Sequence, residues 1–178
     1  MMTKKMVDAL NDQINAETYS AYLYMSMSAY CTFIGLKGAA NWFFVQTQEE
    51  MTHAMRFYFY VNKVNQHVVL KAIEKPPAEF KSLNEMYEAA LKHEKYITGR
   101  INNLVNLAQA EKDHATEVLL QWFVNEQVEE EQNVTEILGQ LKLAGKDSSA
   151  LFMIDKDLST RTFVMPPDLP MGQAAAGA

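Results

Sequence analysis

The sequence predicts an all-α protein: a four-helix bundle with one long crossover and a short fifth helix near the C-terminus. Three observations predict this fold. Proline is absent before Pro76, apolar residues recur alternately three and four positions apart along four long segments, and a segment of 17 residues that includes two prolines lies between the second and third. Because extended chain covers up to ~3.3 Å per residue, that segment can run the length of a bundle.

The first two helices are expected at about residues 4–34 and 37–65. Only Gly35 and Gly38 interrupt the first 75 residues, so the connection between the helices is a short turn. A short turn makes the two helices antiparallel neighbours.

The crossover is expected at residues 65–81, where two adjacent prolines and two adjacent valines favour extended chain. Ser82 and Glu85 then match a capping box, with the serine as N-cap and the glutamate three residues later. This motif predicts that a third helix covers about residues 83–109.

A fourth helix is expected at about residues 113–143, ending at an Ala-Gly pair that is a C-cap signal. Asp147 can cap a fifth helix at about 147–157. The helices would form one domain, residues 1–158. The tail, residues 159–178, holds three prolines and should be loosely held.

Composition excludes several classes of protein. The net charge of −6 indicates no nucleic-acid-binding surface, and the single Cys31 permits no disulfide within the chain. The N-terminus lacks the apolar segment of a signal peptide, and no run of about 18 apolar residues could span a membrane. The cytoplasm is therefore the expected location, with no nucleic acid or membrane as a partner.

Each long helix carries an inward stripe of apolar and aromatic residues that a carboxylate interrupts near its middle. Because bundle helices bury positions spaced three and four apart, the four carboxylates should meet at one level inside the bundle. A buried carboxylate costs several kcal/mol unless it is paired, and no lysine or arginine lies on the stripes. The four carboxylates belong to Glu17, Glu50, Glu94 and Glu130.

Bound metal cations would neutralise this cluster. Glu50 and His53 are three residues apart on one helix face, so one ion can take ligands from both. Four carboxylates and one imidazole can hold two divalent ions, and such ligands suit iron or manganese. One position would use Glu17, Glu50 and His53. The other would share Glu50, add Glu94 and Glu130, and hold its ion less firmly.

Nearby polar residues have further candidate roles. Gln127 is neutral and a weaker ligand, more suited to a hydrogen bond beside the metals. Glu49, Glu126 and Glu129 flank the stripes, and they are either a solvated face or a third, more exposed cation position. Tyr24 lies on the first stripe, where it is either core packing or an electron donor or hydrogen-bond partner to the metals.

The chain resembles the non-haem ferritins of bacteria and archaea, in the ferritin-like di-iron superfamily. The resemblance runs from about residue 4 to 163 and includes "NAETYSAYLYMSMSAY" and "LQWFVNEQVEEE". It is carried by the pattern Glu17, Glu49-Glu50-Met51-Thr52-His53, Glu94 and Gln127-x-x-Glu130. It implies a ferritin-like bundle, a shell of twenty-four subunits around a hollow core, iron storage, and a ferroxidase that uses dioxygen or hydrogen peroxide.

The resemblance also implies roles for particular residues. It matches Tyr24 to a tyrosine beside the ferroxidase centre, which favours the functional interpretation of this residue. It places a third iron position at Glu49, Glu126, Glu129 and Glu130. The implied ferroxidase centre consists of Glu17, Glu50, His53, Glu94 and Glu130, with Gln127 beside it.

Some residues separate this chain from related families. Bacterioferritins carry Glu-x-x-His on the fourth helix, where this chain has Gln127 and Glu130. Met51 lies where bacterioferritins have their haem-ligating methionine, but haem-free members have similar methionines, so haem remains an open alternative that is not favoured as a cofactor. Family members with acidic threefold channels have two acidic residues near the start of the fourth helix. Glu117 matches one and Leu120 replaces the other, which does not support iron entry by that channel.

Two other functions remain consistent with the stripes. A di-iron oxidase or peroxidase without storage would turn over in a small oligomer. A helical interaction protein with an incidental acidic interior would bind no stoichiometric metal and would gain no melting temperature with Fe(II) or Zn(II). The four aligned carboxylates disfavour the second alternative.

Overall fold

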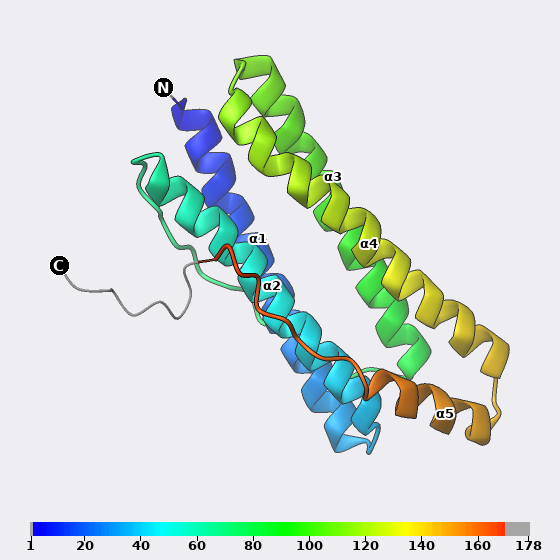
Figure 1. Ribbon diagram of the computed structural model, residues 1–178. Helices are drawn as coiled ribbons and strands as arrows, with labels where there is room; N and C mark the ends of the chain where they lie inside the picture. Colours follow the sequence, from blue (N-terminus) through cyan, green and yellow to red (C-terminus); the bar gives the residue numbers. More distant parts are fainter. Residues whose placement is uncertain (1, 170–178) are drawn as a thin grey trace.

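The structure, a computed structural model, describes residues 2–169 and contains five helices within them (Figure 1). No strand occurs in this part of the chain. The helices are α1 (Lys4–Phe33), α2 (Lys37–Lys63), α3 (Leu83–Glu111), α4 (His114–Ala144) and α5 (Ser148–Leu158). Each end lies within two residues of the position expected from sequence, and the all-α fold is confirmed.

Side chains of the expected types start the helices. The side chain of Ser82 accepts a hydrogen bond from the Glu85 N–H at 3.1 Å, and Asp113 accepts one from the Thr116 N–H at 3.1 Å. The capping box differs from the expected one in a single detail. The Glu85 carboxylate accepts from the N–H of Lys81, one residue before the N-cap, at 2.7 Å.

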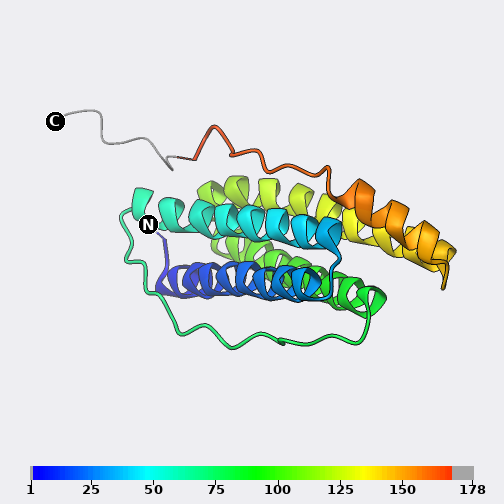
Figure 2. The same ribbon diagram turned by 90° about the horizontal axis from the view of Figure 1, so that it is seen from below.

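The bundle consists of two antiparallel pairs, α1 beside α2 and α3 beside α4 (Figure 1). The chain between the pairs runs along α1 for the length of the bundle (Figure 2). Asn11 fixes its first part, since its side chain donates to the His67 carbonyl at 3.1 Å and accepts from the Val69 N–H at 3.0 Å. The Tyr30 hydroxyl donates to the Phe80 carbonyl at 2.6 Å near its end. The single long crossover is therefore confirmed.

Residues 159–169 run back from α5 along α2 (Figures 1 and 2). The side chain of Asn41 donates to the Arg161 carbonyl at 2.9 Å, and Arg56 forms an ion pair with Asp168 at 2.5 Å. Leu169 is buried. The expectation of a loosely held tail is therefore wrong for residues 159–169, and residues 170–178 lie outside the described part of the chain.

Two apolar clusters fill the bundle, and a polar layer separates them. One cluster includes Met6, Leu10, Phe57, Ile101 and Phe123, and the other includes Met27, Phe43, Met86, Tyr87 and Val134. On every long helix the interrupting carboxylate falls between the residues of these two clusters. The core is thus continuous except at the level where the sequence predicts a cation site. Within residues 2–169, no helix is long and apolar enough to cross a membrane.

Candidate metal centre

The structure places all five residues of the predicted dinuclear centre inside the bundle. Their side chains come from α1, α2, α3 and α4, and the residues are at most 3% exposed. They are Glu17, Glu50, His53, Glu94 and Glu130.

The tightest group joins α1 to α2. Glu17, Glu50 and His53 each offer a ligand atom within 4.8 Å of the others. His53 Nδ1 lies 3.3 Å from Glu50 Oε2. Oε2 of Glu17 and Oε1 of Glu50 are buried without a hydrogen-bond partner among the described residues. Because such oxygens lose their hydration on burial, a bound cation would satisfy both.

A second group lies on the other side of the imidazole. His53 Nε2 is 3.6 Å from Glu126 Oε1, and His53, Glu126 and Glu130 bring their ligand atoms within 4.8 Å of one another. Glu130 also accepts a hydrogen bond from Gln46 Nε2 at 2.8 Å. The ring therefore faces a carboxylate at each nitrogen. From the sequence, Glu126 is expected only beside the dinuclear centre, in the third cation position.

Glu94 is buried at the same level but belongs to neither group. The Tyr24 hydroxyl donates to one of its oxygens, and Gln127 Nε2 donates to the other at 3.5 Å. The structure thus places Tyr24 and Gln127 against Glu94. The predicted second position, in which Glu94 joins Glu50 and Glu130, is not assembled among the described side chains.

Only some residues of the predicted third position lie close to one another. Glu126 lies near His53 and Glu130, whereas Glu129 is exposed. Glu49 forms an ion pair with Arg161 at 2.5 Å. Burial raises the pKa of Glu49 to about 7, although Arg161 acts in the opposite direction.

Burial also perturbs the acid–base behaviour of the centre. It raises the pKa of Glu50 to about 8 and raises the pKa values of Glu17, Glu94 and Glu130. For His53, burial lowers the pKa, but the neighbouring carboxylates of Glu126 and Glu50 outweigh it, so the pKa is well above its usual value. Without a cation the cluster therefore retains protons near neutral pH, and cation binding must displace them.

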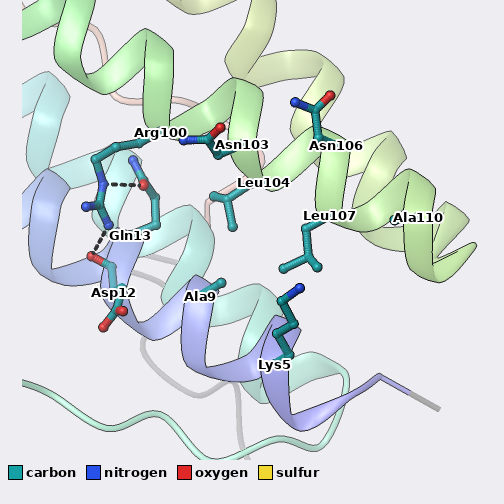
Figure 3. A pocket seen from close by; sticks show the side chains of 10 residues that line it. All are labelled: Lys5, Ala9, Asp12, Gln13, Arg100, Asn103, Leu104, Asn106, Leu107 and Ala110. Carbon is teal, nitrogen blue, oxygen red and sulfur yellow. Dashed lines mark hydrogen bonds between the residues drawn. The ribbon is translucent and has the colours of Figure 1, made fainter.

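Two residues that the sequence analysis missed reach the centre from its side. Gln13 Nε2 donates to Glu17 Oε1 at 2.8 Å, and Arg100 Nε donates to Gln13 Oε1 at 2.9 Å. Figure 3 shows Arg100 reaching from α3 to Gln13 and to the carbonyl of Asp12, beside a pocket of about 480 Å³. A signal existed for Gln13, since it lies four residues before Glu17 and therefore one turn away on the same face.

Comparisons with known proteins agree with this geometry. Residues 7–144 match the family model described as a ferritin-like domain. The chain is 44% identical over 158 residues to a probable bacterial non-heme ferritin-like protein of Haemophilus influenzae, covering 89% of this chain and 96% of that protein. It is 41% identical over 160 residues to a bacterial non-heme ferritin of Escherichia coli, covering 90% and 97%.

Solved structures give the same result. An engineered closed form of the Archaeoglobus fulgidus ferritin is 49% identical, with a TM-score of 0.91 over 92% of this chain and 100% of that chain. The open pore ferritin of the same archaeon is 49% identical, with a TM-score of 0.90 over 91% and 100%. The chain therefore belongs to the ferritin family, whose members have ferroxidase activity, and it is similar to the non-haem ferritins of bacteria and archaea.

Proposed function

We propose that the chain is an iron-storage ferroxidase. It would bind two Fe(II) ions within each bundle, oxidise them with dioxygen or hydrogen peroxide, and store the ferric product inside a shell of twenty-four copies. The observation that carries the proposal is a group of three buried carboxylate oxygens, Oε2 of Glu17 and both oxygens of Glu50, that have no hydrogen-bond partner in the described structure. The ferritin relatives support storage.

Five side chains would bind the substrate iron. One ion would be bound by Glu17, Glu50 and His53, whose ligand atoms already lie together. The other would share Glu50 with Glu94 and Glu130. Because Glu94 lies in neither ligand group, its carboxylate would have to shift toward Glu50 and Glu130 to bind this ion. The second position would therefore fill less readily than the first.

The spacing of two ions explains why such a centre oxidises iron. Ions about 3.5–4 Å apart can both give an electron to one oxidant. Two Fe(II) ions then supply the two electrons that, with two protons, convert dioxygen to hydrogen peroxide. The protons held by the buried carboxyl groups are released when the ions bind. Tyr24, with its hydroxyl on Glu94, is a hydrogen-bonding partner of the second position.

One finer assignment follows from the same resemblance. A third iron would bind more weakly at Glu49, Glu126, Glu129 and Glu130, on the more exposed side of the centre. Iron is the only metal this function requires, and haem is not favoured as a further cofactor.

Substitution of the bridging residue tests the proposal. Glu50→Ala should lower the rate of Fe(II) oxidation far more than Gln127→Ala, because Glu50 would bind both ions and Gln127 would bind neither directly. Stopped-flow absorbance after mixing each variant with about two Fe(II) per chain in aerated buffer measures the rates. Equal rates in the two variants would contradict the assignment of Glu50.

A further inference from the structure

The C-terminal segment brings a positive charge to the edge of the candidate centre. Arg161 Nη2 lies 2.5 Å from Oε2 of Glu49, and the guanidinium stacks over the ring of Trp42, 4.6 Å from its centroid. Both charged side chains are more than 70% buried, with exposed fractions of 21% and 26%. An ion pair this shielded from water is stronger than a typical surface pair.

This contact conflicts with cation binding at Glu49. A metal ion at the third position needs the same carboxylate that Arg161 uses, and the guanidinium already occupies Oε2 of Glu49. The two positive charges would also repel each other at this distance. The Arg161 guanidinium therefore stands in for a metal ion at this carboxylate.

A cavity next to Arg161 could receive its guanidinium group if that group left Glu49. A cavity of about 280 Å³ lies beside Arg161 and is lined by Trp42, Glu136 and Asp157 among others. Nη1 of Arg161 is buried and has no hydrogen-bond partner within residues 2–169. A guanidinium that left Glu49 could therefore meet the carboxylates of Glu136 and Asp157 without leaving the surface of Trp42.

We propose that Arg161 controls occupancy of the third iron position by competing with the metal ion for Glu49. With Arg161 on Glu49 the position is incomplete, and iron binds there only when the guanidinium moves into the neighbouring cavity. The inference rests on the proposed function, because it assumes that a third cation position exists. By thermodynamic linkage, the two effects are equal. The contact between Arg161 and Glu49 weakens metal binding by the same factor by which the bound metal weakens that contact.

Zn(II) binding to the intact assembly tests the proposal without iron oxidation. Equilibrium dialysis should find about two tightly bound Zn(II) per wild-type chain and a weaker third. In Arg161→Gln the third should bind about five-fold or more tightly, the lower end of typical coupling between sites. Arg161→Lys should stay close to wild type, because it retains a competing positive charge.

A control on the same segment separates competition from general loosening. Asp168→Asn breaks the ion pair with Arg56 but leaves Arg161 and Glu49 in place. It should not change the affinity of the third Zn(II). An equal gain in Asp168→Asn and Arg161→Gln would overturn the proposal, as would an unchanged third affinity in Arg161→Gln. If the wild type did not bind the first two Zn(II) ions, that result would instead contradict the proposed function.

A second test keeps Arg161 in place and so does not depend on the folding of an arginine variant. Because the guanidinium stacks on Trp42, its departure should change the fluorescence of that residue. In a Trp122→Phe background, Trp42 is the only tryptophan. Its emission should change as the third Zn(II) binds and should not follow the first two. Emission that is insensitive to the third ion would contradict the movement of Arg161.

Discussion

At the scale of single residues, the carboxylate of Glu17 is positioned by a chain of two hydrogen bonds. The chain begins at Arg100, which is not on the inward stripes. Arg100 orients the amide of Gln13, whose Nε2 then donates to Glu17. Because one oxygen of Glu17 is fixed in this way, the other is left free to meet a cation. Groups that orient ligands commonly change metal affinity by about 10–100-fold when they are removed.

Gln13→Leu should therefore weaken Zn(II) binding at the first position by about ten-fold. The physical reason is that Glu17 loses the donor that fixes its rotamer, while the volume at residue 13 hardly changes. Isothermal titration calorimetry measures the affinity. Gln109→Leu, the same change at an exposed position of α3, is the matched control and should bind as the wild type does. Equal affinity in all three proteins would contradict the role of Gln13.

The residues of the centre differ in how far the sequence could predict them. Glu17, Glu50, Glu94 and Glu130 interrupt apolar stripes, and a carboxylate in such a place needs a partner wherever the helix lies. No comparable sequence pattern predicts the contact between Arg161 and Glu49. This contact joins residues 112 positions apart, and no periodicity relates the segment after α5 to α2.

At the scale of elements, α5 is docked on the start of α2 by close backbone contact. A Cβ atom added at Gly38 would lie 1.5 Å from the backbone oxygen of Asp155. The Asp155 carboxylate also accepts from the Ala39 N–H at 2.9 Å, in the first turn of a helix whose own N-cap residue, Leu36, makes no side-chain bond. α5 thus supplies the cap that the sequence before α2 lacks.

Gly38→Ala should push α5 away from α2 and lower the free energy of unfolding by about 1–3 kcal/mol, the usual cost of overpacking. Thermal or urea unfolding measures the change. Gly139→Ala is the matched control, because a Cβ at this helical position meets nothing within 4 Å. That variant should be neutral or more stable by up to ~1 kcal/mol. Equal stability of the two variants would contradict the close docking of α5.

Helix positions were predictable because their ends carry local signals. Ser82 and Asp147 cap helices as the sequence indicates, and Gly35 and Gly145 take positive φ angles of 86° and 56° at the turns. Residues 159–169 have no comparable local pattern. Their position depends on Asn41, Glu49 and Arg56, all on α2, so it follows from tertiary contacts alone.

At the scale of the whole molecule, the polar layer across the core makes stability depend on pH. The pKa of Glu50 rises from 4.5 to about 8 on burial, and that of Glu49 from 4.5 to about 7. The folded metal-free chain therefore holds protons that the unfolded chain has lost, so these groups contribute less stability as pH rises through their folded pKa values. His93, whose pKa burial lowers to about 4, acts in the opposite direction but only below about pH 6.5.

The metal-free protein should consequently melt at a lower temperature at pH 8 than at pH 6.5. Saturating Zn(II) should reduce this difference, because the bound ion keeps the carboxylates ionised in the folded state. Differential scanning calorimetry at both pH values, with and without the ion, measures it. Glu50→Gln should flatten the pH dependence of the metal-free protein. A melting temperature that rises between pH 6.5 and 8 without metal would contradict the assigned shifts.

Storage is also a property of the whole molecule, because one bundle can bind only a few ions. The most direct test of the account is aerobic loading with a large excess of Fe(II) per chain, followed by size-exclusion chromatography that records protein and iron together. Iron should elute with a very large particle and far exceed a few atoms per chain. About two irons per chain on a small oligomer would contradict storage and would favour a di-iron oxidase.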